Sequence, residues 1–221
     1  MRKVVIATPT YTGDVHMKYT CALLKTVQMA MMRGIDIQVC YTAGDALVQK
    51  ARNYLVTFAI NSGADDLIFI DDDIEWDPEW VFKLLDYPVD IVSGVYRKKV
   101  DDAEIYAVQL TDPIEGDLRT GLMKAKGLAT GFLRLSRKAF VAVWEASRPY
   151  TNGLLPNERM IFDIQIDGET LYSEDYVMSQ KFTNLGFSMW VDPRMCCVHI
   201  GPKPFVGHFI KWLEDNKRFQ N

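Results

Sequence analysis

The sequence has 221 residues, of which 48% are hydrophobic, 12% aromatic and 24% charged, and its formal net charge is −4. These are the proportions of a globular protein, and they exclude a disordered chain, a collagen-like repeat and a coiled coil. The mildly acidic balance argues against a nucleic-acid-binding protein, which normally carries a basic surface. The acidic residues are concentrated in one run, Asp71-Asp72-Asp73-Ile74-Glu75-Trp76-Asp77, and the role of this run is the main question that the sequence raises.

Short β-rich runs alternate with helical patterns through the first hundred residues. Asp45 and Asp77 are expected to cap the second and third helices, because an aspartate side chain accepts hydrogen bonds from the first free N–H groups. Pro78 suits the first position of the third helix. This alternation predicts a right-handed parallel α/β sheet. The expected strands are 3–8, 35–41, 67–70 and 89–95, and the expected helices are 15–33, 45–60 and 78 to about 85.

The second half is less regular, but it continues without a linker or an internal repeat. We therefore expect a single mixed α/β domain over residues 1–221. The apolar patterns predict strands at 105–110, about 123–128, 187–191 and 196–200, helices at 136–145, 174–185 and 206–219, and a loop at 151–159.

No segment is expected to cross a membrane or to direct secretion. No stretch approaches the roughly 18 uncharged apolar residues of a membrane helix. The N-terminal residues become polar too soon for a signal peptide. The four cysteines form no Cys-x-x-Cys pair and are expected to be reduced thiols. We therefore expect a cytoplasmic protein without a membrane span.

The acidic run begins where an apolar strand ends. Leu67-Ile68-Phe69-Ile70 leads directly into Asp71, and ligands of open parallel sheets bind beyond the carboxyl ends of the strands. Alternation along an extended segment points Asp71 and Asp73 to one side and Asp72 to the other. Such carboxylates repel each other unless a cation lies among them, and a divalent ion that holds diphosphate oxygens needs only one or two of them. The run therefore predicts a cation site.

Two other interpretations of the run remain open. It is also compatible with a solvated acidic turn, in which Asp77 does no more than cap the next helix. A phosphatase of the haloacid-dehalogenase type likewise begins with a strand and Asp-x-Asp. That pattern has Thr or Val two residues after the second aspartate, where this chain has Glu75, so the phosphatase pattern is incomplete.

Several segments together resemble the nucleotide-sugar-dependent glycosyltransferases of the GT-A fold, in particular the small phage and algal-virus members. The apolar strand with its Asp-x-Asp is the hallmark, and the similarity extends over roughly residues 3–205. Each motif is weak alone, but their shared order is specific. The further segments are Ala7-Thr8-Pro9-Thr10-Tyr11, 44–53, Gly131-Phe132, Ser173-Glu174-Asp175-Tyr176, and 197–204 with its His-x-Gly-x-Lys-Pro pattern.

The resemblance implies a Rossmann-like GT-A domain with a mixed, mainly parallel central sheet. Residues 1 to about 100 would bind the nucleotide sugar, about 101–205 would form the acceptor side, and 206–221 would form a C-terminal helix. The implied reaction moves a sugar from a nucleoside-diphosphate sugar, with a UDP-sugar as the expected donor, to a hydroxyl group of a glycan. The location would be the host cytoplasm if the protein is viral, and the oligomeric state is left open.

The resemblance also implies roles for individual residues. Asp73 would bind Mn²⁺ or Mg²⁺ directly, Asp71 would contact the ribose or the metal, and His199 is a candidate third ligand because imidazole favours Mn²⁺. Packing or solvation are the alternatives for His199, Tyr11 and Lys203. The sugar-donor site would comprise Thr8, Pro9 and Tyr11 around the base, Arg52 at the base, ribose or phosphate, Asp71 and Asp72 at the acidic turn, and Lys203 on the diphosphate.

Asp175 is the candidate catalytic residue. At the start of a helix its ionised form is favoured by the helix dipole, so it could accept the acceptor's proton if the reaction inverts configuration. If the reaction retains configuration, the leaving phosphate could take that proton and Asp175 would orient the sugar or the acceptor. The Glu174-Asp175 motif is typical of inversion and the His-x-Gly-x-Lys-Pro segment of retention; we favour retention slightly.

Three further alternatives remain. The run Arg97-Lys98-Lys99 after the fourth strand could serve an anionic donor or could be a solvated strand end. A sugar nucleotidyltransferase on a related fold would carry a Gly-rich loop with Arg or Lys after the first strand, and 9–13 is not such a loop. A non-catalytic module that binds a nucleotide or a carbohydrate would not need His199 and Asp175 to converge with Asp73.

Overall fold

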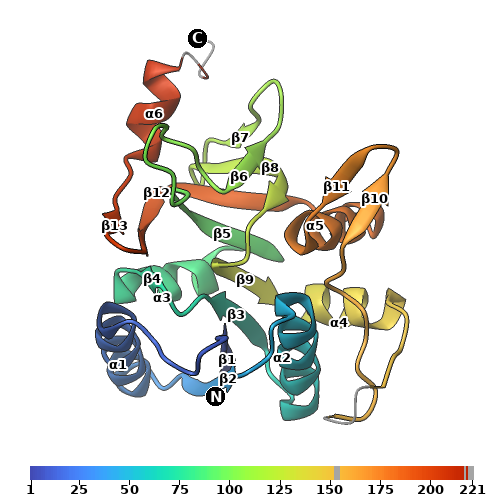
Figure 1. Ribbon diagram of the computed structural model, residues 1–221. Coiled ribbons are helices and arrows are strands. Elements are labelled where there is room, and N and C mark those ends of the chain that lie inside the picture. Colours follow the sequence, from blue (N-terminus) through green and yellow to red (C-terminus); the bar gives the residue numbers. More distant parts are fainter. Residues whose placement is uncertain (152–154, 217, 219–221) are drawn as a thin grey trace.

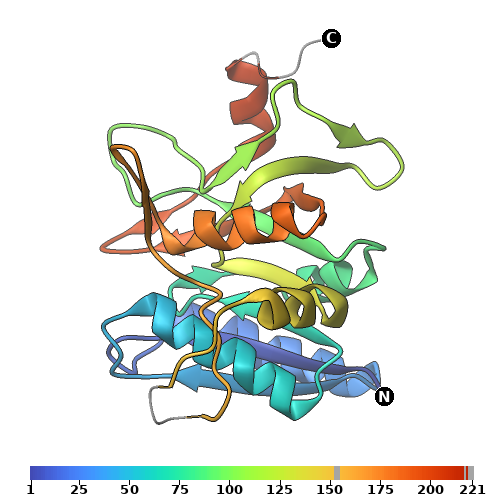
Figure 2. The same cartoon turned by 90° about the vertical axis from the view of Figure 1, so that its right-hand side faces the viewer.

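The computed structural model describes residues 1–151, 155–216 and 218, with a central sheet covered by helices on both faces (Figures 1 and 2). The expected loop at 151–159 and the expected helix at 206–219 each include residues outside this described part. The first half has the expected alternation of strands and helices. Its elements are β1 (Lys3–Pro9), α1 (Met17–Met32), β2 (Asp36–Thr42), α2 (Val48–Ser62), β3 (Asp66–Ile70), β4 (Ile74–Glu75), α3 (Pro78–Asp86) and β5 (Ile91–Tyr96).

The second half departs from expectation in several places. The strands expected at 187–191 and 196–200 are one strand, whose register against β5 shifts between Val191 and Cys196. The strand that follows Gly131 was not expected, and neither were the short strands at 116–117, 165–167, 170–172 and 204–205. The elements are β6 (Val108–Leu110), β7 (Gly116–Asp117), β8 (Leu122–Leu128), β9 (Phe132–Ser136), α4 (Arg137–Ala146), β10 (Gln165–Asp167), β11 (Thr170–Tyr172), α5 (Glu174–Asn184), β12 (Met189–Ile200), β13 (Pro204–Phe205) and α6 (Phe209–Asp215).

The strand order of the main sheet is β2-β1-β3-β9-β5-β12-β8-β6. β2, β1 and β3 are parallel, as are β5 and β12, whereas β9 is antiparallel to both of its neighbours and β8 is antiparallel to β12. The sheet is therefore mixed and mainly parallel in direction, which confirms the expected fold class. β9 separates β3 from β5, so the early and late parts of the chain interleave in one sheet.

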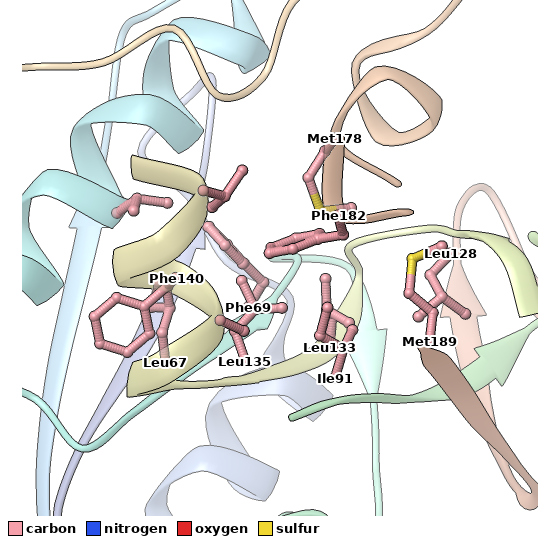
Figure 3. Close-up of a cluster of buried hydrophobic side chains, with 14 of the residues drawn as sticks. Leu67, Phe69, Ile91, Leu128, Leu133, Leu135, Phe140, Met178, Phe182 and Met189 are labelled. Carbon is pink, nitrogen blue, oxygen red and sulfur yellow. The ribbon is translucent and has the colours of Figure 1, made fainter. Parts of the chain in front are cut away.

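The alternating side chains of β3 supply two apolar cores, one on each face of the sheet. Leu67 and Phe69 face α2, α4 and α5, where Phe182 lies among the buried side chains of Figure 3. Ile68 and Ile70 face α1 and α3. Each such side chain contributes about 1.5–3 kcal/mol when fully buried. The acidic run therefore follows a strand whose side chains are packed in apolar cores on both faces of the sheet.

The N-cap residues of the helices agree only in part with those predicted from the sequence. Asp77 caps α3 as expected, because its Oδ1 accepts the Glu79 N–H at 3.0 Å. The prediction for Asp45 was wrong: Leu47 is the N-cap residue of α2, and the Asp45 carboxylate accepts the Leu47 N–H at 3.1 Å in the preceding turn. In the described residues, none of the helices combines the length and the apolar character that crossing a membrane requires.

Candidate active site

The acidic run leaves the sheet at the carboxyl end of β3 and turns back along β12. β4 pairs antiparallel with β12, which places Ile74 opposite His199. The Ile200 N–H donates to the carbonyl of Asp73 at 2.8 Å. This backbone pairing brings Asp73 next to His199, although the two residues lie far apart in the sequence.

Arg52 connects three carboxylates at the centre of the site. Its side chain is only 5% exposed, and its Nη2 donates to both oxygens of Asp71 at 3.0 and 3.2 Å. Its Nη1 donates to Glu174 at 2.8 Å and to Asp175 at 3.0 Å. Burial alone would lower the pKa of Arg52, but the three carboxylates outweigh burial and raise it. Arg52 is therefore a permanently charged clamp between α2, β3 and α5.

Asp175 lies at the start of α5 and is held from two sides. Its Oδ1 accepts the Arg52 hydrogen bond and a second one from Thr130 Oγ1 at 2.9 Å. Burial raises the pKa of Asp175 to about 6, with further upward contributions from Glu174 and Asp71, against the opposing effects of Arg52 and Thr130. A carboxyl group with this pKa can gain or lose a proton near neutral pH, as a general base requires.

Asp73 has a nitrogen group at each of its two oxygens. His199 Nε2 lies 3.5 Å from Oδ1, and Lys99 Nζ donates to Oδ2. Burial would raise the pKa of Asp73, but the neighbouring His199 and Lys99 side chains lower it. The His199 Nδ1 is 2.9 Å from the carbonyl oxygen of Arg97, which can only accept, so Nδ1 carries a proton. In the neutral ring, Nε2 then presents its lone pair towards Asp73.

Two of the three predicted metal ligands converge. A lone pair of His199 and a carboxylate oxygen of Asp73 face each other, and a divalent cation between them would satisfy both. Asp71 lies in the same turn, but both of its oxygens accept hydrogen bonds from Arg52. The described part of the chain contains no group of three His, Cys, Asp or Glu side chains arranged for a metal. The pair nevertheless fits an ion that takes further ligands from diphosphate oxygens and water.

A cavity of about 260 Å³ adjoins this cluster at the carboxyl ends of β1 and β2. Pro9 and Tyr11 line it, and the Tyr11 side chain is 65% exposed. Thr8 does not reach the cavity, because it is buried and its hydroxyl lies 2.5 Å from that of Tyr19. The other lining residues are Thr10, Asp45, Ala46, Val48 and Ala51, of which the last two precede Arg52 on α2.

Asp72 contacts the loop after β1. Its carboxylate is hydrogen-bonded to Thr10, and burial raises its pKa. Thr10 in turn lines the cavity. Asp72 therefore contacts a residue of the cavity wall.

The structure places the two candidate phosphate lysines differently from the sequence prediction. Lys203 forms an ion pair with Asp101 and is 60% exposed. Lys99, which the sequence presented only as part of a basic run, instead contacts Asp73. The order of residues gave no means of choosing between them, because the choice depends on how the loop after β5 folds over the acidic turn.

Other residues of the site were missed by sequence reasoning. Tyr96 is buried, its hydroxyl accepts the Gly131 N–H at 3.1 Å, and the Asp71 N–H donates to the Gly131 carbonyl at 3.2 Å. Thr130 contacts Asp175. The motif Gly131-Phe132 marked this connection as a loop of interest, but nothing in it indicated a contact with the acidic turn.

A larger cavity, of about 1050 Å³, lies between β6, β7, β8 and α6. Its lining includes Tyr106, Phe209 and Trp212, whose rings pack against one another. None of the residues predicted for the site lines it. The size of a cavity alone therefore does not identify an active site. The titratable cluster at the end of β3 is the better candidate for the active site.

No protein-family model matches the sequence, and no curated protein matches it. Several solved structures do match. A197 from STIV aligns with a TM-score of 0.55 and 17% identity over 91% of this chain and 86% of that chain. TarS 1-349 from S. aureus aligns with a TM-score of 0.45 and 14% identity over 86% and 58%.

A glycosyltransferase involved in the glycosylation of the major capsid of PBCV-1 aligns with a TM-score of 0.35 and 10% identity, over 64% of this chain and 65% of that chain. At these identities a structural likeness concerns the fold. The likeness to A197, together with the mixed sheet and its helices on both faces, confirms the GT-A-type fold expected from the resemblance.

Proposed function

We propose that this protein is a metal-dependent glycosyltransferase that moves a sugar from a nucleoside-diphosphate sugar, with UDP as the expected nucleotide, to a hydroxyl group of a glycan. One observation carries the proposal: Asp71, Asp73, His199 and Asp175 come from three separate segments and gather at the carboxyl end of β3. A solvated acidic turn or a simple binding module has no need of this convergence.

The contacts of each residue suggest its role in the reaction. Asp73 and His199 would hold Mn²⁺ or Mg²⁺, which when bound neutralises the charge that develops on the leaving diphosphate. Tyr11 offers an exposed ring to the base at the mouth of the cavity. Arg52 keeps Asp71 and Asp175 at fixed positions, and Lys99 and Lys203 supply positive charge on the side of the diphosphate. Transfer then breaks the bond between the anomeric carbon and the diphosphate oxygen, and forms one to the acceptor oxygen.

The stereochemistry depends on where the acceptor's proton goes. In a retaining reaction, which the His-x-Gly-x-Lys-Pro segment favours, the leaving phosphate takes the proton and Asp175 orients the acceptor. One observation favours the inverting alternative: the pKa of Asp175 is raised to about 6 by burial, which suits a general base near neutral pH.

To test the proposed function, the protein is incubated with a panel of nucleotide sugars, with and without Mn²⁺. Thermal shift reports binding, and NMR follows the slow hydrolysis of the donor and the anomer that is released. We expect stabilisation by one donor class in Mn²⁺ only. Asp73→Ala should abolish that stabilisation, whereas Glu75→Gln, in the same acidic run but paired with Lys18 at 2.7 Å, should preserve it.

Three outcomes would count against the proposal. No stabilisation by any donor in Mn²⁺ would overturn the transferase function. An Asp73→Ala protein that behaves like wild type would exclude Asp73 as a metal ligand. Release of pyrophosphate from a nucleoside triphosphate and a sugar phosphate would identify a sugar nucleotidyltransferase instead.

A further inference from the structure

One lysine occupies the position at which the acidic turn would hold a cation. We propose that Lys99 is the resident counter-ion of Asp73, and that it moves to the diphosphate of the sugar donor when a divalent cation binds Asp73 and His199. This exchange rests on the function proposed above, but it gives an individual role to a residue that the sequence singled out only as part of a basic run.

The contacts of Asp73 make simultaneous occupation unfavourable. Lys99 Nζ donates to one carboxylate oxygen, and His199 Nε2 lies 3.5 Å from the other. A divalent cation shared by Asp73 and His199 would therefore lie within a few ångströms of the ammonium group. Because like charges at such a distance repel strongly in a partly buried site, the ammonium group has to move away.

The ion pair between Lys99 and Asp73 can be broken without disturbing the fold. The two side chains are 33% and 31% exposed, and ion pairs that solvent reaches contribute little to stability. Arg52 differs in this respect, since it is 5% exposed and contacts three carboxylates. Among the cations that contact this acidic cluster in the described residues, Lys99 is thus the one that can exchange.

The side chain of Lys99 runs across a glycine of the His-x-Gly-x-Lys-Pro segment. A Cβ atom at Gly201 would lie 3.1 Å from Cδ of Lys99 and 3.6 Å from Cε. The absence of a side chain at Gly201 therefore leaves the space through which the lysine reaches Asp73. The neighbouring backbone is held, because the Lys98 N–H donates to the Ile105 carbonyl at 2.7 Å. The exchange therefore requires rotation of a flexible side chain and no rearrangement of the loop.

Charge indicates where the ammonium group would go. Oxygens of a diphosphate bound to a cation on Asp73 necessarily lie beside that carboxylate, within reach of a four-carbon side chain. An ammonium group binds phosphate as a compact point charge with three rotatable N–H donors. Lys99 would then replace its contact with one anion by a contact with another, and the charge of the filled site would remain balanced.

Lys99→Met tests the proposal, since it keeps the apolar part of the side chain over Gly201 and removes the charge. Binding of Mn²⁺ without nucleotide, measured from the EPR signal of free Mn²⁺, should tighten about three-fold or more because the competing cation is gone. Binding of UDP and GDP at saturating Mn²⁺, measured by calorimetry, should weaken about ten-fold for the nucleotide that the wild type prefers. Lys98→Met, on the adjacent exposed residue, should change neither affinity.

The proposal requires both effects. If the wild type binds Mn²⁺ and a nucleotide in a manner that depends on Asp73, and Lys99→Met changes only one affinity or neither, the exchange is refuted while the proposed function stands. If the wild type binds neither Mn²⁺ nor either nucleotide, the proposed function fails, and the exchange fails with it.

Discussion

At the residue scale, the contacts of Arg52 determine how the acidic groups of the site are held. The guanidinium group is almost fully buried and hydrogen-bonded to Asp71, Glu174 and Asp175. Arg52→Met would leave these carboxylates to repel one another without a counter-charge. We expect its free energy of unfolding at pH 7, measured with urea, to be about 3–5 kcal/mol lower than that of the wild type.

An exposed ion pair provides the control for this variant. Lys138 is 74% exposed and pairs with Asp90 at 2.9 Å, so Lys138→Met should cost less than about 1 kcal/mol. A similar decrease in the free energy of unfolding in the two variants would contradict the conclusion that the buried ion pairs of Arg52 contribute more than an exposed one.

The stability of the protein should fall as the pH rises through the titration of Asp175. Its pKa is about 6 in the folded protein and about 3.9 in an unfolded chain. The folded state therefore binds more protons between these values, and the contribution of Asp175 is most favourable below about pH 4 and is lost as the pH rises through 6. Asp175→Asn should remove this dependence, so its stability relative to the wild type should rise between pH 4.5 and 7.5 in urea unfolding. A constant difference would contradict the raised pKa.

The same residue should limit activity on the acidic side. If Asp175 is a general base, the rate of transfer or of donor hydrolysis should fall as the pH drops below about 6, because the protonated carboxyl group cannot accept a proton. The Asp175→Asn protein should lose most activity, and its remaining rate should not fall in this way below pH 6. If the rate of the wild type is independent of pH between 5 and 8, Asp175 is an orienting group, as retention of configuration would require.

At the element scale, the connection between β8 and β9 joins the acidic turn to α5. Thr130 contacts Asp175, and Gly131 lies against Tyr96 and the Asp71 backbone. A Cβ atom at Gly131 would lie 2.7 Å from the Tyr96 hydroxyl oxygen, so Gly131→Ala forces a displacement of this connection. We expect a loss of about 1–3 kcal/mol in the free energy of unfolding, and a loss of activity larger than this instability explains.

Gly116 offers a matched control for the glycine substitution. It lies in β7, and a Cβ atom there would have its nearest neighbour at 3.5 Å, an ordinary contact distance. Gly116→Ala should therefore leave both thermal stability and activity close to wild type. If Gly131→Ala behaves in the same way, close packing at Tyr96 does not hold the connection in place.

At the scale of the whole molecule, the order of the strands makes the two halves depend on each other. β9 comes from the second half and lies between β3 and β5 of the first half. Neither half can therefore form its part of the sheet alone. We expect a single unfolding transition in urea, with coincident midpoints for tryptophan fluorescence and for far-ultraviolet circular dichroism. Two separated transitions would show that the halves fold as independent units.

Much of the fold could be predicted because its signals are local. Apolar runs such as Leu67–Ile70 and helical patterns such as that of α3 depend on a few neighbouring residues, and burial on the two faces of the sheet then follows. β9 was missed because it is short and has a buried arginine in its middle. Arg134 is compatible with a central strand because it pairs with Asp66 on β3 and donates to the Val89 carbonyl oxygen, and the sequence reveals neither contact.

The sequence by itself determined that an acidic run follows a buried strand, and that His199 and Asp175 were candidates to join it. Only the tertiary structure decided that Arg52 clamps Asp71 to Asp175, that Lys99 rather than Lys203 contacts Asp73, and that Thr8 faces α1. The physical reason is that these contacts depend on strand order and register, which bring together residues from distant segments. Local patterns indicate which residues can carry charge, and the packing of the sheet determines which charges meet.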